Sequence, residues 1–269
     1  MKIAKMRAPS KGIGTAFIAG DWHSETLDQP TYKILKDHAL SLPPEMRNLI
    51  INGDFLDANH LMKRGDGFST WFKRADGIDE YFIPMSEEEL AWGNKILDDL
   101  QTVFNDIIFI EGNHDWRYKW FSGIVSPDYR HNFDYKKILK FNERKIDHVN
   151  YNDWLDWGEK LSITHGMYHG TTCHKKHYEA SGAKNCIFSH VHYYGCKSFQ
   201  VRGDTRQSIS LPAMSNLNPE YIKNAEMNWS NGYGLIQMRP DSRFNFNVFQ
   251  VWDGKLVLPN GLILDGRKE

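Results

Sequence analysis

The chain has 269 residues, which is enough for one large α/β domain with a sizeable core. Its formal net charge is −1, so no overall field draws it to nucleic acid or membrane, and contact with nucleic acid needs local basic patches. The three cysteines are odd in number and irregularly spaced, which argues against a disulfide framework. No secretory leader follows Met1, and no apolar run reaches the length of a membrane span. We therefore expect a single domain over 1–269 that is soluble and cytoplasmic, with no membrane partner.

Five short apolar segments, typical of strands buried on both faces, each end in Asp, Asn or His. In chain order these segments are 15–20, 49–53, 107–111, 161–164 and 186–189. The polar residues that follow them lie at 21–23, 54–57, 112–115, 165–166 and 190–192. Ligands of open α/β sheets bind at the carboxyl ends of the strands, so these side chains are predicted to meet at one edge. Each motif alone is weak, because Asn, Asp and Gly are ordinary turn residues, but the set offers the oxygen and nitrogen donors of divalent metals.

Helices are predicted between these strands. Residues 30–40 have a proline near the first turn and an apolar stripe along one face. The segment Ser86–Glu89 is a capping box, which predicts a helix from there to about Val103. A weaker helix is expected over 134–142, and a short one ends near Gly182. From about residue 205 the pattern becomes β, with strand candidates at 208–211, 234–238, 244–252 and 255–258.

The ordered motifs resemble those of the calcineurin-like metallophosphoesterases. That family's pattern is Asp-x-His, Gly-Asp-x-x-Asp, Gly-Asn-His-Asp/Glu, a lone His and Gly-His-x-His, met here at 21–23, 53–57, 112–115, 165 and 190–192. One position departs, since Ser189 replaces the glycine of the last motif, which bears on the loop and not on the ligands. The resemblance implies a four-layer α/β/β/α sandwich of two mixed β-sheets flanked by helices. The residue pattern alone gives α/β with a β-rich carboxyl part.

By this resemblance, seven side chains hold two divalent metal ions. Asp54 bridges the ions, one site is completed by Asp21, His23 and His192, and the other by Asn113, His165 and His190. The mixed nitrogen and oxygen donors favour Mn, with Fe, Zn, Ni or Mg as alternatives. Two ions about 3.5–4 Å apart stabilise both the attacking and the leaving oxygen at phosphorus, and a metal-bridging hydroxide is the expected nucleophile.

The resemblance gives two further residues a catalytic role. His114 is the histidine that binds no metal and protonates the leaving oxygen or stabilises the transition state. Asp57 corresponds to the carboxylate that orients this histidine. A single histidine is more often a hydrogen-bonded structural residue, but the complete set in the family's order favours the metal site.

The residues at two positions reduce the range of expected substrates. Ala58 stands where phosphoprotein phosphatases carry a phosphate-holding arginine, and His114 stands where the lipid-A-pathway branch generally lacks a histidine. What remains resembles phosphodiesterases, including DNA-repair exonucleases and cyclic-nucleotide hydrolases. The expected activity is therefore hydrolysis of a phosphodiester in nucleic acid or nucleotides.

An inserted loop or lid is predicted at about 58–85, where basic and aromatic residues interleave. Its candidate substrate-binding residues are Lys63, Arg64, Trp71, Lys73 and Arg74. Such a mixture suits a phosphate backbone and stacked bases, and it favours single-stranded or end-frayed DNA as a partner. The alternative is a surface loop that its aromatic side chains hold in place. Arg117 is a further substrate-binding candidate, although the segment 116–121 equally fits the start of a helix with core packing.

Other functions stay open at this point. The enzyme alternatives are a small-molecule phosphatase and a cyclic-nucleotide phosphodiesterase. A different class is a non-catalytic scaffold that keeps its metals only for structure. The presence of His114 and Asp57 speaks against the scaffold, because neither residue is needed to hold metal.

Overall fold

The computed structural model describes residues 3–4, 14–62, 78–218 and 227–268. Most of the predicted lid at 58–85 therefore lies outside the described residues. The same holds for five of its substrate-binding candidates, namely Lys63, Arg64, Trp71, Lys73 and Arg74.

One six-stranded mixed sheet carries the first three motifs, and its strand order is β12-β11-β2-β3-β4-β5. The strands are β2 (Gly14–Ala19), β3 (Asn48–Asn52), β4 (Asp106–Ile110), β5 (Asp147–Val149), β11 (Asn231–Met238) and β12 (Phe244–Val251). Strands β2 to β5 run parallel to their neighbours, so the carboxyl ends of β2, β3 and β4 share one edge. Strands β11 and β12 are added antiparallel at the β2 side.

A second six-stranded mixed sheet carries the last two motifs, in the order β1-β6-β7-β8-β10-β9. Its strands are β1 (Ile3–Ala4), β6 (Trp154–Trp157), β7 (Leu161–Thr164), β8 (Asn185–Phe188), β9 (Gly195–Val201) and β10 (Asp204–Ser210). Strands β7, β8 and β10 are parallel, whereas β6 and β9 run antiparallel to their neighbours β7 and β10. A separate hairpin near the carboxyl terminus pairs β13 (Lys255–Val257) with β14 (Ile263–Asp265).

The two large sheets pack face to face because their strands are apolar on both sides. Successive residues of a strand point to opposite faces, so Ala16 and Ile18 of β2 join the core between the sheets. Phe17 and Ala19 of the same strand belong to the second core, which the helices cover. All six residues of β2 are buried, as expected for a central strand with a layer on each side.

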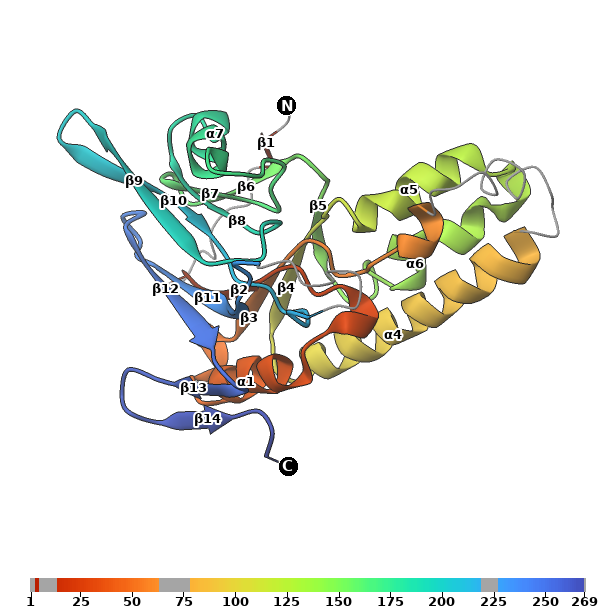
Figure 1. The fold of residues 1–269 in the computed structure, drawn as a ribbon, viewed down its shortest axis with the longest axis horizontal. Helices are drawn as coiled ribbons and strands as arrows, with labels where there is room; N and C mark the ends of the chain where they lie inside the picture. Colours follow the sequence, from red (N-terminus) through yellow and green to blue (C-terminus); the bar gives the residue numbers. More distant parts are fainter. Residues whose placement is uncertain (1–2, 5–13, 63–77, 219–226, 269) are drawn as a thin grey trace.

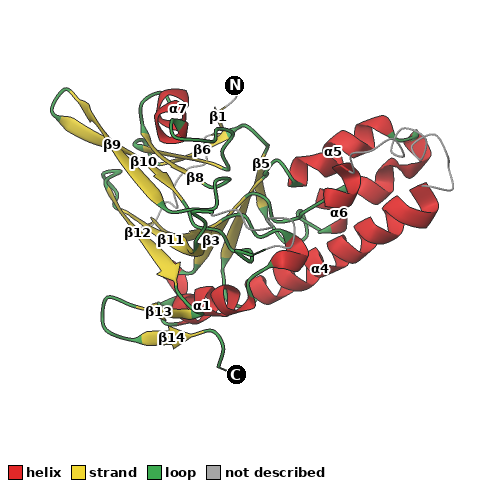
Figure 2. Ribbon diagram, viewed as in Figure 1, coloured by secondary structure: helices red, strands yellow, loops and turns green. Residues whose placement is uncertain are grey.

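Helices form the two outer layers (Figures 1 and 2). The longer helices α1 (Gln29–Leu40), α4 (Ile83–Gln101) and α5 (Asp115–Ile124), with the short α6 (Tyr135–Ile138), pack on the sheet of β2 to β4. Helix α7 (Cys173–Ala180) lies on the other sheet, against β8 and β10. Short 3₁₀ helices occur at Ser24–Thr26, Pro44–Met46, Asn59–Met62 and Pro127–Phe133, and a π-helical turn at Ile78–Phe82. The predicted α/β fold of two mixed sheets flanked by helices is thus confirmed.

Two element predictions need correction. The capping box is wrong, because α4 begins at Ile83 and Ser86 lies inside it, where its hydroxyl is 2.8 Å from Nε2 of His60. The weak helix at 134–142 is confined to α6, whose amino end is capped by the Asp134 carboxylate. The helix at 30–40 is confirmed as α1. Within the described ranges, none of the helices has both the length and the apolar character that a bilayer span requires.

Candidate metal centre

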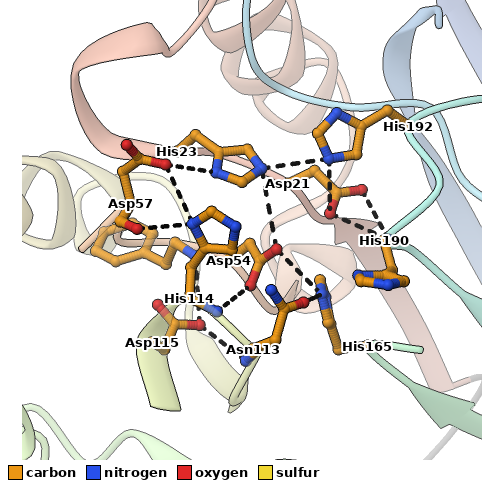
Figure 3. Close-up of polar contacts among 12 residues, drawn as sticks. Asp21, His23, Asp54, Asp57, Asn113, His114, Asp115, His165, His190 and His192 are labelled. Atoms are coloured by element: carbon orange, nitrogen blue, oxygen red, sulfur yellow. Dashed lines mark hydrogen bonds and ion pairs between the residues drawn. The ribbon is translucent and has the colours of Figure 1, made fainter. Parts of the chain in front are cut away.

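The polar residues of all five motifs gather where the two sheets meet at the carboxyl ends of their strands (Figure 3). Backbone hydrogen bonds tie the loops together, since the Asp21 amide donates to Gly53 O over 3.0 Å. The two sheets are linked in the same way, because the His190 amide donates to the Asp21 carboxylate over 3.0 Å. The side chains therefore come from both sheets and converge at one edge.

The backbone at this edge is strained. Several non-glycine residues have a positive φ, in the left-handed region that L-residues rarely adopt. At the site they are Asp21 (56°), His23 (49°), Asp54 (50°), His190 (74°) and His192 (60°). Such a residue costs on the order of 1–3 kcal/mol and persists only where the surrounding structure enforces it. Five of the seven predicted metal-binding residues are held in this way, which the sequence did not reveal.

The first cluster consists of Asp21, His23 and His192, whose donor atoms lie within 4.8 Å of one another. The Nε2 atoms of His23 and His192 face each other at 3.3 Å, and Nε2 of His192 is 3.6 Å from Asp21 Oδ1. Nδ1 of His192 is buried and has no hydrogen-bond partner among the described residues. The ring of Trp229 packs against His192 at a centroid distance of 4.4 Å, so packing helps to fix this imidazole.

The second cluster consists of Asp54, His165 and His190, again within 4.8 Å. Nε2 of His165 is 3.2 Å from Asp54 Oδ2 and 3.1 Å from the amide oxygen of Asn113. Its other ring nitrogen, Nδ1, lies 2.9 Å from the backbone oxygen of Asn52, an arrangement that orients Nε2 into the cluster. Asp54 Oδ2 is also 3.9 Å from Nε2 of His23, so this carboxylate lies between the two clusters.

The protonation of these groups is strongly perturbed. Burial raises the pKa of Asp21 to about 8. Burial acts in the same direction on Asp54, but the attraction of His165 and His114 outweighs it and holds the pKa of Asp54 well below its usual range. For His165 burial lowers the pKa, yet the nearby Asp54 carboxylate raises it to about 9. Burial lowers the pKa of His190 to about 3 and that of His192 well below its usual range.

These residues fit divalent cations. Two fully buried carboxylates lie beside imidazole rings, with no lysine or arginine paired to them among the described residues. The Nε2 atoms of His23 and His192 face each other at 3.3 Å, so a divalent cation could accept the lone pairs of both rings. Carboxylate, amide and imidazole donors in this mixture are those of Mn, Fe, Ni and Zn sites.

His114 lies next to the clusters and is held by Asp57. Nδ1 of His114 is 2.7 Å from the Asp57 backbone oxygen and 3.2 Å from its carboxylate. Asp57 Oδ1 is also 3.0 Å from Nδ1 of His23, so one carboxylate touches both imidazoles. Burial opposes ionisation of Asp57, but its hydrogen bonds to the two histidines dominate and lower its pKa. Burial lowers the pKa of His114, and the Asp54 and Asp57 carboxylates reverse this and raise it.

Two buried carboxylates beneath the motif loops were missed as functional supports. Asp115 accepts hydrogen bonds from the amides of Leu56 and Gly112, each over 2.8 Å, and burial next to Asp54 raises its pKa to about 7. Glu89 accepts from the amides of Asp57 and Ala58 over 2.6 and 3.0 Å. The sequence signal for Glu89 was present but was interpreted as helix capping, whereas Asp115 is the last residue of the central motif.

Ser189, the one departure from the family pattern, has a clear structural role. Its hydroxyl accepts a hydrogen bond from the Asn52 side chain over 2.8 Å, which links the end of β8 to the end of β3. The facing residue is Gly20, where an added Cβ would lie 2.1 Å from the Ser189 hydroxyl. The absence of a side chain at Gly20 therefore leaves room for the Ser189 side chain.

Arg117 reaches the site from the first turn of α5. Its Nη1 donates to the Asp57 backbone oxygen over 2.9 Å, and its Nη2 lies 3.0 Å from Nε2 of His114. Two other residues of the segment 116–121, Tyr118 and Phe121, are buried in the core. The helix start with core packing is thus confirmed, while substrate binding by Arg117 stays a prediction.

A family model, described as calcineurin-like phosphoesterase, matches residues 15–194, about two-thirds of the chain. The chain belongs to this family, which supports a metal-dependent phosphoesterase.

Among solved structures, wild-type Vps29 of Entamoeba histolytica in complex with zinc matches at 10% identity with a TM-score of 0.45, over 90% of this chain and 95% of that chain. Vps29 of Cryptosporidium parvum matches at 10% identity with a TM-score of 0.44, over 91% and 95% of the two chains. No curated protein matches the chain at a significant level.

Replacing Gly112 should test how closely the central motif approaches Asp54. A Cβ there would lie 2.2 Å from both the backbone nitrogen and Oδ1 of Asp54, and backbone cannot give way cheaply. We expect Gly112→Ala to lower the free energy of unfolding by roughly 1–3 kcal/mol, as overpacking does, measured by denaturant titration.

The matched control is Gly123→Ala in α5, where an added Cβ meets nothing within 4 Å. This variant should be neutral or up to about 1 kcal/mol more stable, because alanine is the better helix former. Equal stabilities for the two variants would show that the close approach of residues 112 and 54 is not a constraint.

Proposed function

We propose that the chain is a dinuclear-metal phosphoesterase. The observation that carries this proposal is the convergence of two donor clusters on either side of Asp54. Asp21, His23 and His192 hold one ion, while Asn113, His165 and His190 hold the other, and Asp54 serves both. The mixed oxygen and nitrogen donors favour manganese, with iron, zinc, nickel or magnesium as alternatives.

When bound, two divalent ions polarise a phosphoryl oxygen and lower the pKa of water towards neutrality. The residues of the chain contribute orientation and a proton. Asn52 O fixes the ring of His165, and Asp57 fixes the ring of His114 through Nδ1. Nε2 of His114 lies 3.0 Å from Nη2 of Arg117, and in the protonated ring it donates its proton to the leaving oxygen.

The same geometry argues for an enzyme over a metal-bearing scaffold. His114 contacts Asp57 and Arg117 at its two ring nitrogens and belongs to neither of the two clusters described above, although one of its nitrogens also lies within 4.8 Å of donor atoms of His23 and Asp54. A scaffold gains nothing from a half-buried histidine held at both ring nitrogens beside its metals. A proton donor needs that restraint, because it must be positioned before the bond breaks.

For the substrate we propose a phosphodiester of nucleic acid or nucleotides, with single-stranded or end-frayed DNA among the accepted polymers. Support comes from Ala58, a buried alanine in a place where a phosphate-holding arginine would favour dianionic monoesters. Further support is the basic and aromatic composition of 63–74, which lies outside the described residues. A cyclic-nucleotide phosphodiesterase or a small-molecule phosphatase is the second candidate.

Metal content gives the first test of this function. Protein purified without chelator should hold two divalent ions per chain, counted by elemental analysis, and chelation should abolish hydrolysis of bis-nitrophenyl phosphate. We expect Asp54→Ala to lose metal and to lower activity by more than about 100-fold, the upper end for residues that only support metal ligands. Asp106→Ala, an exposed carboxylate at the start of β4, is the control and should keep both. Full activity in chelator would refute the metal mechanism.

A second test separates proton donation from metal binding. His114→Ala should keep its metal content, because His114 lies outside the proposed ligand set. On esters with a poor leaving group the rate should fall about 10²–10⁴-fold, the range for a general acid. On nitrophenyl esters the loss should be much smaller, since nitrophenolate leaves without a proton. Equal losses on both kinds of ester would exclude leaving-group protonation.

A third test addresses the substrate class. We expect bis-nitrophenyl phosphate to be hydrolysed faster than mononitrophenyl phosphate, because a monoester dianion needs an additional cation. A labelled single-stranded oligonucleotide should be cleaved, with an affinity that falls with salt as several phosphates are contacted. Faster turnover of the monoester would overturn the diester proposal. A cyclic nucleotide cleaved beside an inert oligonucleotide would favour the second candidate.

A further inference from the structure

The guanidinium of Arg117 lies across the loop that follows β3. Nη1 donates to the Asp57 backbone oxygen over 2.9 Å and to the side-chain oxygen of Asn59 over 2.7 Å. Nη2 lies 3.0 Å from Nε2 of His114. Three different segments of the site therefore meet at one cation.

Two of these contacts are to neutral oxygens, and the third is to His114 Nε2, which accepts from Arg117 when the ring is neutral. In the described part of the chain, no ion pair joins Arg117 to a carboxylate, whereas Arg144 pairs with Asp98 over 2.7 Å and Arg206 with Asp204 over 2.8 Å. The Arg117 side chain is half-buried, and its partial burial lowers its pKa. A cation removed from water normally lies against an anion. Arg117 forms no such direct pair among the described residues, although the Asp54 and Asp57 carboxylates attract it from farther away.

The guanidinium of Arg117 lies beside both residue 58 and His114. Asp57 O and Asn59 Oδ1 flank Ala58, so the guanidinium covers residue 58 from the outside. An oxygen atom that approaches Nε2 of His114 also comes within hydrogen-bond reach of Nη2 of Arg117. Nε–H and the second N–H of Nη2 have no partner among the described residues, so they remain as donors in the fork that suits phosphate oxygens.

We propose that Arg117 and Asn59 form a phosphate-binding subsite on the leaving-group side of His114. Arg117 binds an anionic oxygen of the reacting phosphoester, and Asn59 is a positioning residue that holds the guanidinium. This inference rests on the proposed function, and it names the phosphoryl group itself as the ligand.

Asn59 links the subsite to Asp57 as well. Its amide nitrogen donates to the Asp57 carboxylate, while its amide oxygen accepts from Arg117. Replacing this amide by a carboxylate would place a negative charge against Nη1. Asn59→Asp therefore satisfies the charge of Arg117 within the protein, and it also loses the hydrogen bond to the Asp57 carboxylate, so its metal content is measured beside its phosphate affinity.

The experiment compares metal-loaded wild type with Arg117→Ala, Arg117→Lys, Asn59→Asp and Lys119→Ala. Binding of inorganic phosphate is measured by calorimetry, and KM and kcat are measured with bis-nitrophenyl phosphate. We expect Arg117→Ala to weaken phosphate binding and raise KM by about 10–100-fold, the range for a hydrogen bond to a charged group. Arg117→Lys should recover part of this loss, and Asn59→Asp should weaken binding with the arginine still present. Lys119→Ala removes an exposed cation from the same helix and should change nothing.

Added guanidinium ion should restore phosphate affinity to Arg117→Ala in a saturable manner, which a purely structural role would not produce. Unchanged phosphate affinity in Arg117→Ala, or a loss that coincides with loss of metal, would overturn the subsite. Phosphate binding that depends on Arg117 in a protein without turnover would support the subsite and refute the proposed enzyme. Metal-loaded Arg117→Ala that hydrolyses the diester as well as wild type would refute the subsite and leave the enzyme standing.

Discussion

The burial of two carboxylates side by side is the constraint on which the rest of this structure depends. Asp21 and Asp54 have almost no contact with solvent, and the effective cost of burying one ion is several kcal/mol. Their neighbours add strained backbone, at about 1–3 kcal/mol for each residue with positive φ. The arrangement persists because the surrounding apolar layers leave these residues no other position.

Those layers explain why the cluster is located at this edge. Strand β2 is buried on both faces, so its end and the ends of β3 and β4 are fixed by two cores. The backbone amides of the loops that follow these strand ends have no hydrogen-bond acceptors in regular secondary structure. Buried carboxylates accept their hydrogen bonds instead. Glu89 and Asp115 accept the amides of residues 55–58 and 112, which would otherwise be buried without acceptors. The carboxylates of Glu89 and Asp115 thus satisfy the backbone amides, while the side chains of the two donor clusters are available for a ligand.

The sequence predicts the gathering of the motif residues well, because each strand signal and its polar end are local in the chain. It predicts helix α1 for the same reason. The start of α4 could not be predicted from neighbouring residues, because Ser86 and Glu89 have the spacing of a capping box. Their actual partners are distant in sequence: Ser86 contacts His60, and Glu89 accepts from the amides of residues 57 and 58. Strand β9 was missed because its residues are mostly exposed and polar, and its pairing with β10 is what makes it a strand. Backbone strain has no sequence signal in Asp or His.

Asp57 shows how metal binding and proton donation can depend on one another here. Its carboxylate is 3.0 Å from Nδ1 of His23, in the first donor cluster, and 3.2 Å from Nδ1 of His114, outside the clusters. Glu89 and Asn59 hold Asp57 through its amide and its carboxylate. A shift of this single group would therefore move a candidate metal-binding imidazole and the candidate acid together. Because Arg117 contacts the backbone oxygen of Asp57 as well as His114, an anion that engages Arg117 acts on the same unit. Under the proposed function, substrate binding and leaving-group protonation are coupled through one carboxylate and not through the ions alone.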